Sequence, residues 1–152
     1  MTTVFISRAE GKVFTDSRGT YLDGSYEDNV TKRWCLDHKR TVYGCGSVNE
    51  IVDVLPNLRI GLPIKLKNST IVVVRDGTKD VYLYEPNKVK FLGFTFYKDS
   101  ICDAITEKHI AMGSGAGYLW SRLCAGVEVK DAFKQTFLQD IKSGGDIRTW
   151  EL

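Results

Sequence analysis

Residues 71–74 restrict the fold of this chain more than any other stretch, because all of them are apolar and β-branched. A run of this composition predicts a buried strand. The Asp76-Gly77 pair that follows is a strong turn signal, and residues 81–84 then alternate aliphatic with tyrosine side chains before Pro86. We therefore expect a hairpin here, followed by a further strand over residues 88–97.

Strands and helices are also indicated at both ends of the chain. Residues 4–6 and 12–15 flank a Glu-Gly turn and predict an opening β-hairpin. Near the other end, one helix is expected to begin close to Tyr118, and apolar side chains at helical spacing predict a second helix over residues 129–141. Residues 147–150 are a candidate final strand.

The helix expected in the middle of the chain is bounded by clear signals. Ser47 and Glu50 have the spacing of a capping box and precede an apolar stripe. Pro56 should keep this helix short, and the sequence from there to Thr70 is too short and too broken for a second helix. The order of elements favours an α+β layered domain over alternating βαβ units.

Composition and charge limit the classes of function. A chain of 152 residues with 43% hydrophobic residues suits a single domain, which we expect to span residues 1–152. The formal net charge of +2 gives no indication of nucleic-acid or membrane-surface binding. We find no signal-peptide pattern and no apolar stretch long enough to span a bilayer. The four cysteines form no Cys-x-x-Cys pair, which favours reduced thiols in a cytoplasmic protein and indicates no metal or cofactor site.

The start of the chain offers a chemically active group. Removal of Met1 would leave Thr2 as the amino terminus, with a hydroxyl and a free amine on one residue. Such an amine titrates near ~7.7 to 8.0, so it is substantially neutral at cellular pH and can activate the hydroxyl. An ordinary loose terminus has the same sequence, so the dipeptide alone does not decide between the two interpretations.

Motifs that are weak alone occur along the chain in an informative order. They are Thr2 at the start of a strand, Asp16-Ser17-Arg18 after the returning strand, Lys32, the loop Gly44-Cys45-Gly46-Ser47, Gly113-Ser114-Gly115, and Asp140-Ile141-Lys142-Ser143-Gly144-Gly145. In this order the chain resembles the β-subunits of the proteasome and the bacterial HslV-type peptidase, which are N-terminal nucleophile (Ntn) hydrolases. The resemblance covers nearly the whole chain. It implies a four-layer αββα sandwich of two antiparallel sheets, with one helical layer reduced.

The resemblance also implies a threonine-type peptidase with a defined set of residues. The catalytic set would be Thr2, Asp16, Lys32, Ser114, Asp140 and Ser143. Thr2 would act as the nucleophile with its own α-amine as general base, and the charge of Lys32, oriented by Asp16, would favour the deprotonated amine. The two serines and the second aspartate would hold that amine by hydrogen bonds.

Further residues are assigned around the substrate. A backbone N–H of the small-residue loop, at Gly46, would stabilise the oxyanion, and Val30, Cys45 and Ser47 would line the substrate pocket. Substrates would be peptides or unfolded proteins, without a cofactor. Family resemblance further implies a homo-oligomer and an ATPase unfoldase as a partner.

Other interpretations of the same residues remain open. The glycines at 113, 115 and 117 before a helix could form a dinucleotide or phosphate loop, although no βαβ unit surrounds them. A catalytically inactive member of the same fold, acting as a structural or binding subunit, would share most of the pattern. Without the resemblance, Asp16 would be an ordinary turn residue, and Lys32 would be a surface lysine.

Overall fold

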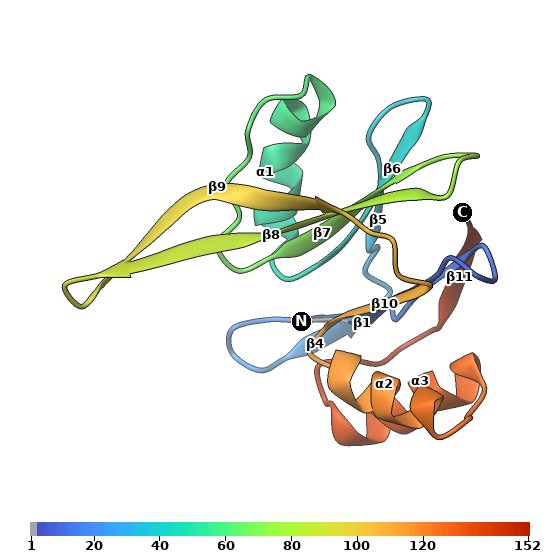
Figure 1. Ribbon diagram of the computed structural model, residues 1–152. Helices are drawn as coiled ribbons and strands as arrows, with labels where there is room; N and C mark the ends of the chain where they lie inside the picture. Colours follow the sequence, from blue (N-terminus) through green and yellow to red (C-terminus); the bar gives the residue numbers. More distant parts are fainter. Residues whose placement is uncertain (1–2) are drawn as a thin grey trace. The chain divides into compact units, whose positions relative to one another are not determined.

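A computed structural model describes residues 3–152, so the predictions for Met1 and Thr2 lie outside the described residues. The chain divides into two compact units. Unit 1 contains the described residues up to Lys32 together with Glu107–Leu152, and unit 2 contains Arg33–Thr106. Each unit is an antiparallel sheet with helical cover on one face (Figure 1). The predicted single domain over residues 1–152 stays a prediction.

The sheet of unit 1 is built around the opening hairpin. Its four strands lie in the order β10-β1-β2-β11 and comprise His109–Gly113, Thr3–Ser7, Lys12–Thr15 and Arg148–Glu151. The predicted hairpin is confirmed, since Val4 pairs with Thr15 and Ile6 with Val13. The predicted final strand is confirmed as β11. A short ribbon of β3 (Arg18–Thr20) and β4 (Tyr26–Asp28) follows β2.

Two helices pack on the sheet of unit 1. They are α2 (Ala116–Cys124) and α3 (Val129–Gln139). Phe133 of α3 is fully buried and packs against Phe14, with the ring centroids 6.4 Å apart. The prediction that the second helix extends to Ile141 was wrong, because the backbone of Asp140 is extended and Ile141 is 78% exposed.

The sheet of unit 2 has five strands in sequence order. They are β5 (Arg33–Cys35), β6 (Arg40–Cys45), β7 (Thr70–Arg75), β8 (Asp80–Phe91) and β9 (Phe94–Ala104). The predicted buried strand is confirmed, since all of residues 71–74 are buried in β7. The apolar face formed by Ile71 and Val73 packs against α1.

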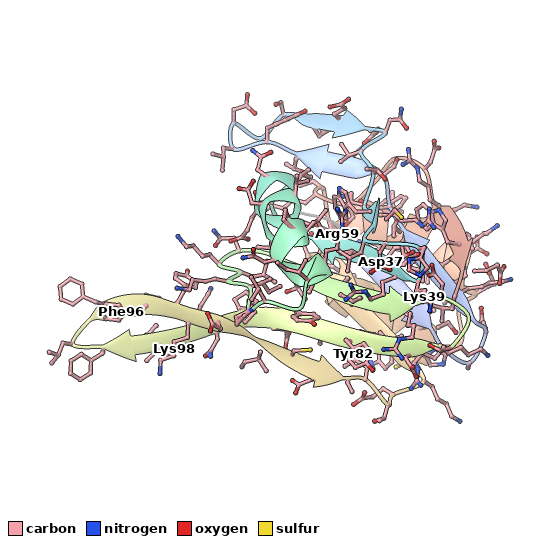
Figure 2. The ribbon with its side chains drawn as sticks, turned by 90° about the horizontal axis from the view of Figure 1, so that it is seen from above. Asp37, Lys39, Arg59, Tyr82, Phe96 and Lys98 are labelled. Carbon is pink, nitrogen blue, oxygen red and sulfur yellow. The ribbon has the colours of Figure 1, made fainter. Side chains whose placement is uncertain are left out.

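The predicted separate strand over residues 88–97 was wrong. Residues up to Phe91 continue β8 past Pro86, where a register shift lets the strand accommodate the proline. The chain then reverses at Leu92 and Gly93, which have φ angles of 48° and 80° and so suit a two-residue hairpin turn. The resulting β8–β9 hairpin is long, and Phe96 and Lys98 lie towards its free end (Figures 1 and 2).

Helix α1 (Val48–Arg59) begins at the predicted cap and is longer than predicted. The hydroxyl of Ser47 accepts from the Glu50 N–H at 3.4 Å, which confirms the cap. Pro56 lies inside the helix rather than ending it. The lost hydrogen bond falls on the solvent side, because Pro56 is exposed and the carbonyl it leaves unpaired belongs to Val52, which is 45% exposed. The expected lack of a second helix is confirmed for residues 60–69.

The mixed content of sheet and helix is confirmed, with three sheets and three helices in residues 3–152. None of these helices is long and apolar enough to cross a membrane.

Candidate functional site

Thr3 is the first described residue, and it is fully buried at the start of β1. Its backbone N–H donates to Asp16 Oδ1 at 2.9 Å. Its side-chain Oγ1 lies 2.7 Å from Ser143 Oγ. Its carbonyl accepts from the Asp16 N–H at 3.2 Å, so all three polar groups of Thr3 are engaged and its hydroxyl is buried.

Asp16 is fully buried directly after β2, and its two carboxylate oxygens have different partners. Oδ1 accepts from Thr3, and Oδ2 accepts from the backbone N–H of Gly144 at 3.0 Å. The ammonium of Lys32 lies 3.7 Å from Oδ1, and the Lys32 side chain is only 5% exposed. Lys32 Nζ also donates to the Arg18 carbonyl at 2.5 Å. Because an isolated buried charge is costly, this pair compensates two charges that water does not reach.

Asp140 organises the second half of the site. Its Oδ2 accepts from Ser114 Oγ at 2.6 Å and from Ser143 Oγ at 2.7 Å, and its Oδ1 accepts from the Lys142 N–H at 3.2 Å. Ser143 has one hydroxyl proton, which it donates to this carboxylate. The hydroxyl of Thr3 must then donate to Ser143 Oγ, so the order of donors along this chain of hydrogen bonds is fixed.

Thr3 therefore connects the two carboxylates. Its amide binds Asp16, and its hydroxyl reaches Asp140 through Ser143. All five predicted catalytic residues within the described chain belong to unit 1, and they form one network around Thr3. Their roles in catalysis stay predictions, and Thr2 itself lies outside the described residues.

Close packing around Thr3 explains one glycine of the predicted motifs. A Cβ added to Gly115, at the start of α2, would lie 2.2 Å from Thr3 Oγ1 and 2.7 Å from Thr136 Cγ2. Real Cβ contacts are longer than this, so any side chain at position 115 would force the Thr3 or Thr136 side chain to move. Gly115 has φ −85°, which any residue can adopt.

The strand-end segment after β2 is held by bonds that the sequence did not reveal. Ser17 is buried, and its N–H donates to the Gly144 carbonyl at 3.1 Å. Its Oγ accepts from the Asp146 N–H at 2.8 Å. A Cβ on Gly145 would lie 2.4 Å from that same Oγ. The Ser143-Gly144-Gly145 motif thus fixes Asp16 from the side opposite β1.

Of the predicted substrate residues, Val30 lies in unit 1. Its backbone N–H donates to the Ser17 carbonyl at 2.8 Å. Its side chain covers Gly19, where an added Cβ would approach Val30 Cγ2 to 2.6 Å. Val30 is thereby fixed to the same segment that carries Asp16.

The predicted oxyanion loop belongs to unit 2. Gly46 has φ +116°, and a Cβ there would lie 2.5 Å from the Asn68 carbonyl oxygen, so only glycine fits. Cys45 is buried, and its thiol donates to the Thr70 carbonyl at 3.7 Å. Ser47 caps α1. The assignment of these residues to one site with Asp16 stays a prediction.

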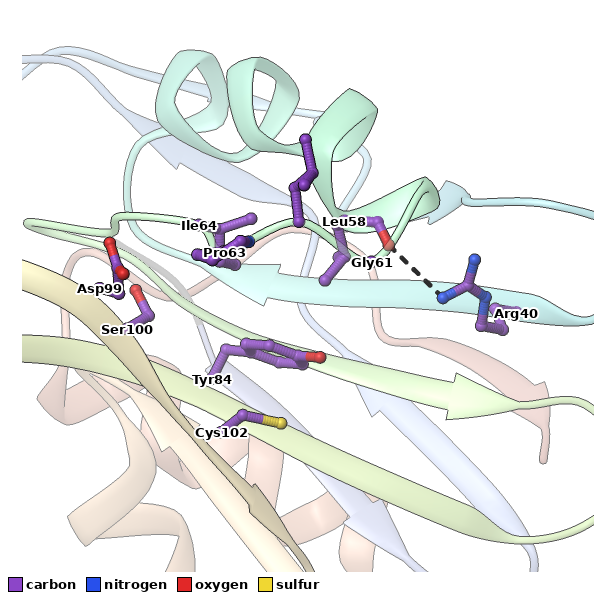
Figure 3. A pocket seen from close by; sticks show the side chains of 10 residues that line it. Arg40, Leu58, Gly61, Pro63, Ile64, Tyr84, Asp99, Ser100 and Cys102 are labelled. Carbon is purple, nitrogen blue, oxygen red and sulfur yellow. Dashed lines mark hydrogen bonds between the residues drawn. The ribbon is translucent and has the colours of Figure 1, made fainter.

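A pocket in unit 2 contains none of the predicted site residues. It has a volume of about 270 Å³ and opens between Leu58, Ile64, Tyr84 and Cys102 (Figure 3). The pKa of the Tyr84 hydroxyl is raised to about 12, mainly by burial and secondly by its hydrogen bond with Cys102. Arg40 lies at the edge of the pocket and donates hydrogen bonds to the Leu58 carbonyl, the Asp37 carboxylate and the Arg59 carbonyl. We assign no chemistry to this pocket.

The network of unit 1 provides no metal site. Within residues 3–152, no three His, Cys, Asp or Glu side chains are placed to hold a metal ion together. What the arrangement supplies is a buried ammonium, two hydrogen-bonded carboxylates and aligned hydroxyls beside the first strand. Groups of this kind can position and polarise a neighbouring amine and hydroxyl.

Comparison with known proteins gives a fold relationship. No protein-family model matches the chain, and no curated protein matches its sequence. Among solved structures, the chain is similar to the crystal structure of eukaryotic HslV from Trypanosoma brucei. The TM-score is 0.59 at 13% sequence identity, and the match covers 99% of this chain and 100% of that chain. This chain has an HslV-like fold. At this identity the likeness concerns the fold alone.

Proposed function

We propose that this chain is a threonine-type, proteasome-like peptidase whose nucleophile is Thr2 after removal of Met1. The observation that carries the proposal is the buried pair of Lys32 and Asp16, with Asp16 bound to the amide of Thr3. Burying an ammonium and a carboxylate is costly, and the end of a strand does not need such a pair to fold. If Thr2 is the amino terminus, the positive charge of Lys32 would lower the pKa of its α-amine.

Burial of Thr3 decides which threonine could react. Its hydroxyl is fully buried and donates to Ser143. A substrate carbonyl would have no access to it. We therefore place the nucleophile at Thr2 rather than at Thr3.

The proposed chemistry needs only groups of this chain and water. The neutral α-amine of Thr2 takes the proton of the Thr2 hydroxyl, whose oxygen attacks the peptide carbonyl carbon. Collapse of the tetrahedral oxyanion breaks the C–N bond, and the leaving amine accepts the proton. Water then hydrolyses the ester and restores the hydroxyl. Lys32 would keep the α-amine neutral through its positive charge, and a backbone N–H at Gly46 would stabilise the oxyanion.

The wider setting is part of the same proposal. The αββα sandwich is supported by the HslV likeness. We further propose peptide or unfolded-protein substrates, a homo-oligomer, a cytoplasmic location and an ATPase unfoldase partner. A pocket formed by Val30, Cys45 and Ser47 would set the substrate preference.

The decisive experiment combines intact mass with covalent labelling. Protein produced in cells should lack Met1. A peptide epoxyketone should then attach through both the hydroxyl and the amine of Thr2, and blocking the α-amine beforehand should prevent this double linkage. Absence of an adduct on trimmed, folded protein would support the alternative, a catalytically inactive structural or binding subunit of proteasome-like fold.

Two substitutions at the same position provide the control. Thr2→Ala should abolish turnover of a fluorogenic peptide, whereas Thr2→Ser keeps a hydroxyl and should retain part of it. Equal activity in the two variants would show that the nucleophile is elsewhere.

A further inference from the structure

The β8–β9 hairpin extends beyond the sheet to which it belongs. β7 pairs with β8 only from Ile71↔Tyr84 to Arg75↔Asp80. From Asn87↔Lys98 to Phe91↔Phe94, the two strands pair only with each other within the described chain. Figure 1 shows this ribbon running on past the other strands of its unit. A two-stranded ribbon of this kind is marginally stable in water unless one face is covered.

The two faces of this ribbon differ sharply. Cross-strand partners share a face and alternate along each strand. One face therefore carries Val89, Phe91, Phe94 and Phe96, and the other carries Lys88, Lys90, Thr95 and Tyr97. The three phenylalanines of the first face are 64%, 69% and 53% exposed, and Leu92 in the turn is 79% exposed. Contiguous exposed aromatic side chains of this kind mark an interaction surface.

Unit 1 has a pocket of matching character. It has a volume of about 420 Å³ and is mainly apolar, with Phe5, Trp120, Leu123, Val127 and Val129 in its walls. The charged residues among its lining are both carboxylates, Glu10 and Glu128. His109 also lines it, and its Nδ1 is a buried atom with no hydrogen-bond partner among residues 3–152. The pocket can thus receive an apolar group, and its rim favours a cation.

We propose that the hairpin end of one copy, residues 87–98, inserts its aromatic face into this pocket of a second copy. Lys98 continues the aromatic face beyond Phe94 and Phe96, and residues 88–98 contain no acidic residue, which complements the Glu10 and Glu128 carboxylates of the pocket. The hairpin end and the pocket are different surfaces, so each copy donates one hairpin and receives another. Such head-to-tail contacts close into a ring when the rotation between copies allows it. This assembly does not depend on peptidase activity.

The first test uses matched substitutions on opposite faces of one strand. Phe94→Lys places a charge on the aromatic face, and Thr95→Lys places the same charge on the polar face. Sedimentation equilibrium should give an oligomer for the wild type and for Thr95→Lys, and a monomer for Phe94→Lys. Circular dichroism should show that all three are folded. A monomeric wild type, or an unchanged mass for folded Phe94→Lys, would overturn the proposal.

The second test distinguishes head-to-tail contacts from contacts between two hairpins. Trp120 lines the pocket and is 44% exposed, so Trp120→Lys adds a repelling charge there without emptying the core. Trp120→Lys and Phe94→Lys should each be monomeric alone. Their mixture should form dimers and nothing larger, because only one intact hairpin and one intact pocket remain per pair. An oligomeric Trp120→Lys variant, or a mixture that stays monomeric, would refute head-to-tail insertion.

Discussion

Replacing the buried ammonium should destabilise the protein far more than replacing an exposed one. In Lys32→Met the Asp16 carboxylate stays fully buried and loses its neighbouring cation. Removing one partner of a buried pair costs about 3–5 kcal/mol. Asp16 keeps the N–H donors of Thr3 and Gly144, and the pair is separated by 3.7 Å, beyond direct hydrogen bonding. We therefore expect the lower end of the range, about 3 kcal/mol.

The assay is equilibrium urea unfolding, with thermal unfolding as a second readout. For a chain of this size each kcal/mol lowers the melting temperature by roughly 2–4 °C, so a shift of about 6–12 °C is expected. Lys134→Met is the matched control, because Lys134 pairs with Asp131 at 3.4 Å while the two side chains are 70% and 61% exposed. That exposed pair should contribute about 0–1 kcal/mol. Equal losses in the two variants would refute the desolvated state of the Lys32–Asp16 pair.

Two further substitutions test the packing and the ionic contacts beside the site. Gly115→Ala should cost about 1–3 kcal/mol in thermal unfolding, because the new Cβ would meet Thr3 Oγ1 at 2.2 Å. Gly117→Ala is its control, since a Cβ there meets nothing within 4 Å and alanine favours the helix, so it should not destabilise. The second substitution concerns Asp28, where the two hydrogen bonds from Arg18 lower the carboxyl pKa below its ordinary value of 3.8. Above pH 3.8 the ionised carboxylate of Asp28 stabilises the fold, and this contribution is lost as the pH falls through the lower pKa of the folded state. Asp28→Asn should therefore be less stable than the wild type at neutral pH. In acid the stabilities of the two proteins should converge. A difference between the two proteins that persists unchanged at low pH would contradict this.

Local patterns predicted most of the strands and helices because burial and local geometry agree there. Residues 71–74 are apolar and β-branched, and they are buried on both faces of β7. Ser47 caps α1 because its hydroxyl accepts from the Glu50 amide, a contact between residues three apart. Patterns of this range can be recognised without knowledge of the tertiary structure.

The wrong predictions concern positions where the surroundings outweighed the local signal. Pro56 was expected to shorten α1, but it lies on the exposed side, where water can satisfy the freed carbonyl. Leu92 adopts a positive φ, which a bulky side chain rarely does, so nothing in the sequence marked the hairpin turn before Gly93. Ile141 matched the helical spacing, but the carboxylate of Asp140 takes its partners outside the helix.

The sequence motifs identified five residues that lie together in the structure, but they did not identify Thr3, which connects them. The carboxylates and serines were found through the order of motifs, and the structure brings those of the described chain together in unit 1. Thr3 was missed, because its contacts are with Asp16 and Ser143, which lie 13 and 140 residues away along the chain. Spacing along the sequence carries no signal for contacts at such separations. A fully buried threonine at the start of a strand could be recognised only from the structure.

The proposed chemistry therefore depends on the register of β1. Phe5 packs against Phe14, with ring centroids 6.1 Å apart, and belongs to the core beneath α2 and α3. Because successive side chains of a strand point to opposite faces, a slip of one residue would turn Phe5 out of that core. The same slip would move the Thr3 amide away from Asp16 and its hydroxyl away from Ser143. Hydrophobic packing of Phe5 thus helps to hold Thr3 between the two carboxylates.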